Sequence, residues 1–219
     1  QDGTQALSYP YWYVPETNTG VSTGVDLNGD GQIRRVPGTQ EYGDDSFGFG
    51  RYPGQFGMLV LSRYPITVPA IRTFQNLLWS KMPENLLPTD FYSPEAIALF
   101  RLSSKNHIDV PIDVEGTTFH LLASHPTPPS FDGPEDRNGR RNHDEIRFWS
   151  DYLTGTEAYL LDDQGRPGGR GEDKAFVLVG DLDSDHTDGD SRQVAIQGLL
   201  KHPRIQDPHP TRQGARANS

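Results

Sequence analysis

Three aspartates stand at alternate positions directly after the most strand-like run of the chain. Residues 175–179 (Ala-Phe-Val-Leu-Val) lead into Gly180, Asp181, Asp183 and Asp185. Carboxylate oxygens suit hard divalent cations such as Mg²⁺ or Mn²⁺, and a metal ion beside a phosphate neutralises charge during phosphoryl transfer. The segment is therefore a candidate phosphoester-hydrolysing centre, and the alternative is a solvated turn without chemistry.

A histidine ends a second apolar run. Residues 117–124 read as a strand that leads into His125 and a proline-rich segment. Histidine gains or loses a proton near neutral pH and so suits acid–base catalysis. Because strand ends of a buried sheet hold reactive groups rigidly, we expect His125 and Asp181 to share one cleft. The alternative is that His125 only ends its strand.

A second candidate site lies near the start of the chain. The eight residues that begin at Asp26 match the start of an EF-hand-like loop, with oxygen ligands from Asp26, Asn28 and Asp30. The carbonyl of Gln32 is a further expected ligand. Position 12 is Pro37 rather than glutamate, so a bidentate ligand would have to come from elsewhere. We expect Ca²⁺ at this 26–33 loop, and the alternative is a turn rich in Asp and Asn.

Apolar runs and turn signals predict the elements that would position these groups. The expected strands are 56–61, 66–73, 108–114, 117–124 and 175–179. The expected helices are 94–100 (Ser93 as N-cap), about 140–153, and one capped by Ser191 that runs to about 201. Glu115 and Gly116 predict a hairpin, and residues 1–55 are expected to be mostly irregular. Strands that alternate with helices and hairpins indicate a mixed α/β protein.

The composition excludes several classes of protein. The 219 residues carry 20 Lys+Arg against 30 Asp+Glu, a formal net charge of −10, and they include no cysteine. Disulfides, thiolate zinc sites and cysteine nucleophiles are therefore excluded. No apolar run approaches the roughly 18–20 residues that span a bilayer. The acidic balance makes duplex DNA a less favoured partner and suits a protein that binds cations.

Several strings of residues resemble the endonuclease/exonuclease/phosphatase superfamily. The segment Gly180–Asp185 is similar to its Gly-Asp-x-Asn-x-Asp signature, and His125 resembles its catalytic histidine. Residues 52–58, followed by Leu-Ser-Arg-Tyr-Pro, resemble its strand that ends in Leu-Ser-Arg-x-Pro. The strings His-Pro-Thr-Pro-Pro and Phe-Asp-Gly-Pro-Glu-Asp-Arg-Asn-Gly-Arg-Arg-Asn resemble the bacterial, typically exported branch.

The resemblance implies a fold and a reaction. The fold is a single α/β domain over residues 1–219, a two-sheet sandwich flanked by helices as in deoxyribonuclease. The reaction is metal-dependent phosphoester hydrolysis with water as nucleophile and Mg²⁺ or Mn²⁺ as the metal. His125 would be the acid or base, Asp181 would hold the attacking water or the transition state, and Asp183 would support them. An extracellular, periplasmic or cell-envelope location is implied as well.

The resemblance also implies substrate-binding residues. Arg141 and Asn142 lie in a segment similar to the Arg-Arg-Asn of inositol polyphosphate 5-phosphatases, and they would bind the phosphate, which tilts the expected substrate toward a small or lipid-like phosphoester. The alternative is an ion-pair network of the arginines with nearby acids, namely Asp132, Glu135, Asp136 and Glu145. We expect Lys105 and His107 to lie in a solvated loop rather than in the cleft.

The chain departs from the family pattern in two ways. Asp183 replaces an asparagine whose amide donates a hydrogen bond, whereas an ionised aspartate only accepts. We also expect an internal fragment without the terminal family motifs, inactive alone, with a partner chain or further segments covering its sheet edges. The alternative function is a non-catalytic, calcium-stabilised binding or assembly component with the same fold.

Overall fold

The computed structural model describes residues 7–170 and 174–208. The strands are β1 (Tyr11–Tyr13), β2 (Val60–Ser62), β3 (Arg72–Thr73), β4 (His107–Val114), β5 (Thr117–Ser124) and β6 (Phe176–Val179). The α-helices are α1 (Gln40–Asp44), α2 (Pro94–Leu99), α3 (Arg137–Thr154) and α4 (Gln193–Leu200). Two short 3-10 turns are η1 (Val68–Ala70) and η2 (Trp79–Lys81).

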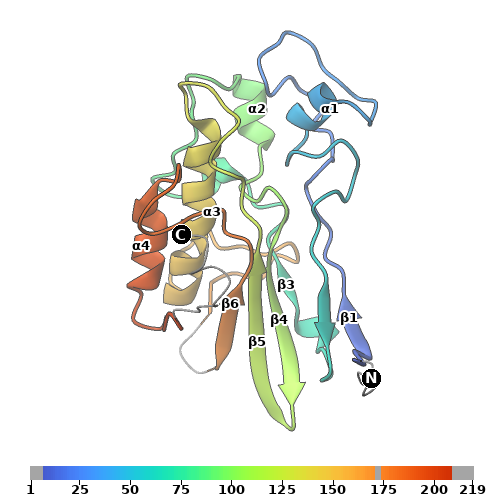
Figure 1. The fold of residues 1–219 in the computed structure, drawn as a ribbon, viewed down its shortest axis with the longest axis vertical. Coiled ribbons are helices and arrows are strands. Elements are labelled where there is room, and N and C mark those ends of the chain that lie inside the picture. Colours follow the sequence, from blue (N-terminus) through green and yellow to red (C-terminus); the bar gives the residue numbers. More distant parts are fainter. Residues whose placement is uncertain (1–6, 171–173, 209–219) are drawn as a thin grey trace, which may run out of the picture.

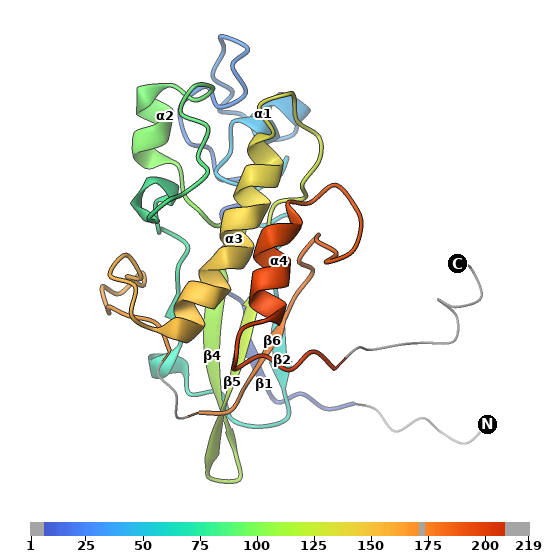
Figure 2. The ribbon, with the colours of Figure 1, turned by 90° about the vertical axis from the view of Figure 1, so that its left-hand side faces the viewer.

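Three layers make up the molecule. Strands β3 to β6 form one sheet in the order β3-β4-β5-β6, in which only β5 and β6 run parallel, while β1 and β2 form a separate antiparallel pair. Helices α3 and α4 lie on one side of the larger sheet, and β1 and β2 lie on the other (Figures 1 and 2). The predicted α/β class and two-sheet sandwich flanked by helices are confirmed.

The buried core has two parts, one on each face of the larger sheet, because successive side chains of a strand such as β4 point to opposite faces. Ile108, Val110 and Ile112 point toward the β1–β2 pair and pack with Val60 in the smaller core. On the opposite face of the same sheet, Leu122 of β5 belongs to the larger core, which α3 and α4 fill. Period-two burial on both faces is typical of a sheet covered on each side. The larger sheet is thus the rigid middle layer of the protein.

The helix α3 is the main support of this sheet. Its buried aromatic residues Phe148, Trp149 and Tyr152 pack against one another, with ring centroids 5.3 to 5.7 Å apart. Aromatic side chains bury large areas and prefer such edge and offset contacts. Gly155 ends the helix in the left-handed conformation (φ 82°), as the common glycine C-cap does.

Most predicted elements are confirmed, with local corrections. The hairpin of β4 and β5 is confirmed, and Ser93 caps α2 by accepting a hydrogen bond from the Ala96 N–H at 3.2 Å. Ser191 does not cap α4, because Arg192 occupies the N-cap position and the Ser191 hydroxyl instead binds that of Ser184. The expected 56–61 and 66–73 strands are shorter or broken, and β1 and α1 were not predicted.

Apolar side chains remain exposed on the outer strands. Trp12 of β1 and Leu61 of β2 are 66% and 50% exposed, and Val177 and Val179 of β6 are also exposed. Such edges are prone to pair with other chains, in keeping with the expectation that something covers them, which stays a prediction. Among the residues described, none of the helices combines the length and the apolar character that crossing a bilayer requires.

Candidate active site

Strands β5 and β6 end side by side. Their parallel register pairs Ala123 with Val179, so His125 and Asp181 both follow at the same end of the sheet, the upper end in Figure 1. The backbones of the two strand ends approach each other closely at Gly180. Its φ is 151°, and an added Cβ would lie 2.0 Å from the carbonyl oxygen of Ser124. Only glycine fits there. The structure therefore brings the two predicted strand ends together.

His125 and Asp183 form the central pair of this site. Nε2 of His125 lies 3.7 Å from Oδ2 of Asp183, and each side chain is 26% exposed. Asp183 adopts a left-handed backbone conformation (φ 49°). Its Oδ2 is buried and has no hydrogen-bond partner among the described residues. A buried carboxylate oxygen without a hydrogen-bond partner among the described residues thus lies beside the imidazole.

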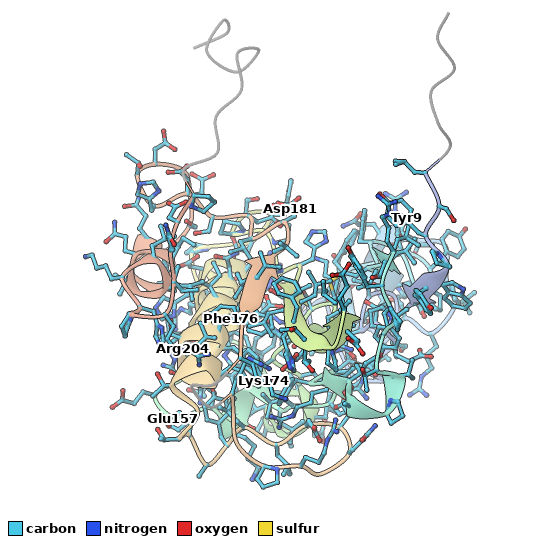
Figure 3. All side chains as sticks on the ribbon, turned by 90° about the horizontal axis from the view of Figure 1, so that it is seen from below. Tyr9, Glu157, Lys174, Phe176, Asp181 and Arg204 are labelled. Atoms are coloured by element: carbon cyan, nitrogen blue, oxygen red, sulfur yellow. The ribbon has the colours of Figure 1, made fainter. Side chains whose placement is uncertain are left out.

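The three alternate aspartates do not converge. Asp181 is exposed at the outer edge of the view in Figure 3. Asp185 accepts hydrogen bonds from the backbone N–H groups of Thr187 and Asp188, and these bonds lower its pKa. Within residues 7–170 and 174–208, no three His, Cys, Asp or Glu side chains gather closely enough to hold a metal ion. Of the three aspartates, Asp181 and Asp183 are therefore the ones whose charges act on His125.

Lys105 lies inside the site, so the expected solvated loop is wrong. Lys105 is only 5% exposed, and its Nζ donates a hydrogen bond to the carbonyl oxygen of Pro126 at 2.9 Å. His107 is fully buried, with its ring nitrogens 2.6 Å from the Ser103 hydroxyl and 2.8 Å from the Glu145 carbonyl oxygen. Burial lowers the pKa of His107 to about 4. His107 is hence a neutral core residue, whereas Lys105 brings a cation to the site.

Burial of His125 favours its neutral form. Burial, and next the nearby Lys105 ammonium, lower the pKa of His125. Burial, and next the neighbouring Asp181, raise the pKa of Asp183. Burial also lowers the pKa of Lys105. Shifts with such local causes are a recurrent property of catalytic sites.

Helix α3 fixes the loops that carry these groups. The buried Glu145 carboxylate accepts the N–H groups of Ser104 and Thr127, both at 2.6 Å. Nδ2 of Asn142 donates to the carbonyl oxygens of Thr127 and Leu182, at 2.9 and 3.0 Å. Two side chains on adjacent turns thereby hold the Lys105, His125 and Asp183 loops in one arrangement.

Arg141 and Asn142 are buried, and their side chains donate hydrogen bonds to backbone carbonyl oxygens. The Arg141 guanidinium donates hydrogen bonds to the carbonyl oxygens of Leu102, Phe47 and Arg101, at 2.6 to 2.9 Å. These bonds are to backbone and not to the acids of the expected ion-pair network. Asn142 is fully buried, and its Oδ1 has no partner among the described residues. Phosphate binding by either residue stays a prediction.

A cavity of about 570 Å³ opens beside the central pair. Lys105, His125 and Asp183 line one part of it, and aromatic side chains line much of the rest. Small-molecule sites typically enclose roughly 300–1,000 Å³, with mostly apolar walls and a few polar groups. The arrangement therefore suits a small ligand that carries a charged group.

Similarity to a known protein family covers nearly the whole chain. The model of the Endonuclease/Exonuclease/phosphatase family matches residues 5–219. The chain belongs to this family. The resemblance that the His125 and Gly180–Asp185 segments indicate is thereby confirmed.

Two solved structures are similar to the chain at low identity and low TM-score. Sphingomyelinase C from Streptomyces griseocarneus is 17% identical, with a TM-score of 0.38 over 68% of this chain and 38% of that one. A double mutant of beta toxin from Staphylococcus aureus with bound magnesium ions is 13% identical, with a TM-score of 0.39 over 69% and 40%. The chain thus spans about two fifths of the length of each. No curated protein matches the chain.

Sequence reasoning missed two residues of this family member's site. Lys105 was placed in solvent, and Glu145 was considered only as an ion-pair partner. The predicted hairpin could have indicated the position of Lys105. The register that pairs His107 with Ser124 also places Lys105 opposite Pro126, next to His125. The role of Glu145 depends on packing between α3 and two loops, and no local pattern indicates it.

The 26–33 loop is pinned by the protein itself. Both carboxylate oxygens of Asp26 accept backbone N–H groups within the loop, from Gly29 and Gly31 at 2.7 and 2.8 Å. Outside the loop, the carboxylate of Asp45 accepts the N–H groups of Leu27 and Arg34, each at 2.9 Å. Asn28 and Asp30 likewise accept N–H groups two residues on. These bonds fit a turn rich in Asp and Asn, and they leave calcium binding by this loop a prediction.

Proposed function

We propose that the protein is a metal-dependent phosphoester hydrolase that uses water as its nucleophile. The observation that carries the proposal is the meeting of His125, Asp183 and Lys105 at one end of a cavity, where β5 and β6 end and β4 begins. Membership of the Endonuclease/Exonuclease/phosphatase family supports the same reaction class. The reaction needs a base for water and positive charge for the phosphate.

His125 is the proposed general base. Its lowered pKa keeps the imidazole neutral at neutral pH, so a ring nitrogen is free to accept a proton from the attacking water. Asp183, 3.7 Å from Nε2, would stabilise the imidazolium that forms. Asp181, exposed at the neighbouring strand end, would help to orient the water.

Lys105 is the proposed phosphate ligand. An ammonium group has three N–H donors, and the hydrogen bond described for Lys105 is the one to the Pro126 carbonyl oxygen. The remaining donors are available to phosphate oxygens in the cavity that Lys105 lines. A buried cation acts on a phosphate more strongly than a solvated one, because less water screens it.

The described residues can supply part of a metal site. Mg²⁺ is commonly held by one or two carboxylates together with substrate phosphate oxygens. Asp181 is the residue that would hold Mg²⁺ or Mn²⁺ here, because its carboxylate is exposed at the strand end. A metal ion bound there would neutralise charge on the phosphate. Since no three metal-binding side chains cluster in the described chain, further ligands would come from substrate and from other groups.

The proposed substrate is a small phosphoester rather than duplex DNA. The net charge of −10 opposes binding of a polyanion through many phosphate contacts. A cavity of about 570 Å³ instead fits a small molecule. The resemblance of the 125–142 strings to the exported branch supports a location outside the cytoplasm.

Turnover by the full gene product tests this proposal. We expect hydrolysis of bis(p-nitrophenyl) phosphate with Mg²⁺ or Mn²⁺ and its loss in EDTA. The His125→Ala variant should be inactive, while the matched variant His202→Ala, at the end of α4, should retain activity. No turnover of any phosphoester by a folded protein would favour the non-catalytic binding or assembly component, for which Asp183 in place of asparagine is the supporting observation.

We also propose that the 26–33 loop binds Ca²⁺ through Asp26, Asn28, Asp30 and the Gln32 carbonyl. Weak sites of this kind have Kd values of about 10⁻⁴–10⁻³ M, so about 1 mM Ca²⁺ would stabilise folding by about 0.4–1.4 kcal/mol. The measurement is the melting temperature in Ca²⁺ and in EDTA, for the wild type and for Asp30→Asn. Equal melting temperatures in both buffers would leave only the turn that Asp45 pins.

A further inference from the structure

The cavity has two chemically different parts. Lys105, His125 and Asp183 line the part at the strand ends. The rest of the lining includes six apolar side chains, Phe49, Phe56, Tyr92, Phe100, Pro128 and Phe131, together with polar ones such as Asn28, Gln40 and Asn138. The proposed hydrolysis uses only the first part, so the aromatic part has no role in that chemistry.

Two of these phenylalanines have an unfavourable backbone conformation. Phe56 and Phe131 have φ values of 60° and 67°, in the left-handed region that bulky side chains rarely occupy. They are also 50% and 88% exposed, so burial of their own rings does not compensate for the strain. Strained residues of this kind concentrate at ligand sites. Both residues line the same cavity, on loops far apart in sequence.

The ring of Phe49, the third exposed phenylalanine of the cavity, packs where a helix residue has no side chain. Phe49 is 41% exposed and packs on α1 at Gly43. A Cβ at position 43 would lie only 2.7 Å from the Phe49 ring. A glycine inside a helix lowers its stability relative to alanine. Here the missing side chain gives the aromatic ring its place at the cavity wall.

The arginines at the aromatic part are already engaged. Arg137 pairs with Glu135, and its guanidinium also lies 5.1 Å from the Phe91 ring centroid. Arg141 donates to three backbone carbonyl oxygens and lies 4.4 Å from the Phe100 ring centroid. A phosphate would therefore find its free donors at Lys105, and the aromatic part would face the rest of the molecule.

We propose that the aromatic part of the cavity binds an aromatic ester group of the substrate, with the phosphate at the Lys105–His125 part. This inference rests on the proposed function and names its substrate class. Aromatic walls favour a ring through edge and offset stacking. A cavity of about 570 Å³ suits a compact ring better than a long acyl chain.

Binding of phosphonates tests the inference without turnover, because their C–P bond is not hydrolysed. Phenylphosphonate, hexylphosphonate and methylphosphonate share one charged group and differ only in the attached group. By calorimetry with the full gene product and Mg²⁺, we expect phenylphosphonate to bind about tenfold more tightly than methylphosphonate, since its ring leaves water. Hexylphosphonate should bind no more tightly than phenylphosphonate.

Variants separate the two parts of the cavity. The double variant Phe56→Ala/Phe131→Ala should abolish the preference for phenylphosphonate and keep methylphosphonate binding. The control Trp12→Ala removes a 66% exposed aromatic residue on β1, outside the cavity, and should keep the preference. Lys105→Met should weaken all three phosphonates alike.

Each outcome has one meaning. Equal affinity for phenylphosphonate and methylphosphonate, or a preference that survives the double phenylalanine variant, would overturn the aromatic subsite and leave the proposed function standing. Tighter binding of hexylphosphonate would overturn the choice of a ring. Failure of all three to bind, or indifference to Lys105→Met, would overturn the phosphate site, and the aromatic subsite with it.

Discussion

Two His–Asp pairs occur on the same sheet, and they differ in how completely they are satisfied. In the middle of the sheet, Nδ1 of His120 lies 2.5 Å from Oδ1 of Asp109. The other carboxylate oxygen of Asp109 accepts hydrogen bonds from Tyr152 at 2.6 Å and from Arg170 at 3.0 Å. At the strand ends, Nε2 of His125 and Oδ2 of Asp183 are 3.7 Å apart, and this oxygen has no hydrogen-bond partner among the described residues.

The pKa values of the two aspartates follow this difference. Burial alone would raise the pKa of Asp109, but hydrogen bonds from His120 and Tyr152 outweigh it and lower the pKa. Asp183 has no such donors, so burial and the nearby Asp181 raise its pKa. A fully bonded carboxylate stabilises the fold, while an incompletely bonded one is available to a ligand. The same pair of residue types thus serves structure in one place and, on our proposal, chemistry in the other.

The largest expected effect is the loss of turnover in His125→Ala. A general base contributes about 10²- to 10⁴-fold to a rate, so kcat/KM should fall by that factor with little change in melting temperature. His120→Asn should do the opposite, with a lower melting temperature and an unchanged kcat/KM of the folded protein. An equal loss of kcat/KM in both variants, at unchanged folding, would remove the distinction between the two pairs.

The second effect concerns stability. Removing one partner of a buried ion pair costs about 3–5 kcal/mol, so Asp109→Ala should lower the free energy of unfolding by that amount in urea titrations. Asp90→Ala, at an exposed aspartate, is the matched control. Because the pKa of Asp109 is lowered in the folded state, its contribution is present at neutral pH. This contribution is lost as the pH falls from about 4 through the lowered folded value, so the difference in stability between wild type and variant should become smaller there.

The sequence predicts a feature of these two pairs when the residues that determine it are close together in the chain, and it does not when they are far apart. The β4–β5 hairpin and the apolar run before Gly180 are local patterns, and they located His125 and Asp181 at neighbouring strand ends. Local patterns also located the cap of α2 at Ser93. The pairing of Asp109 with Arg170 joins residues 61 positions apart, and nothing in either segment indicates it.

The unpredicted elements have the same cause. Strand β1 pairs with β2 across a long irregular segment, and α1 has only five residues, with Thr39 as its cap. The segment of Arg141 resembles a family motif, and that motif does not indicate the three distant carbonyl oxygens to which its guanidinium donates hydrogen bonds. Motifs identify residue types, but only packing decides which atoms remain free.

The third effect tests whether Lys105 belongs to the His125 pair. Hydrogen bonds to charged groups contribute about 1.5–3 kcal/mol, so Lys105→Met should lower kcat/KM by roughly 10- to 100-fold. The variant also removes the cation that helps to lower the pKa of His125, while Asp181, Asp183 and Glu145, which raise it, remain. The acidic limb of the pH–rate profile should therefore move to higher pH, and Lys105→Arg should restore part of the shift. A smaller rate with an unmoved limb would show that Lys105 acts only through packing.

The smallest effect is a gain of stability in Asp183→Asn. The pKa of Asp183 is raised in the folded state, so its stabilising contribution exists in acid, below the unfolded value, and is lost as the pH rises through the folded value. At pH 7 in EDTA, the asparagine variant should thus be more stable, by roughly 0.5 kcal/mol as for other partly exposed sites. Below about pH 4 the gain should vanish, since the aspartate is then protonated in both states. An asparagine variant that is less stable than the wild type at pH 7 would mean that Asp183, like Asp109, has bonding partners that hold it ionised, and the contrast between the two pairs would then be lost.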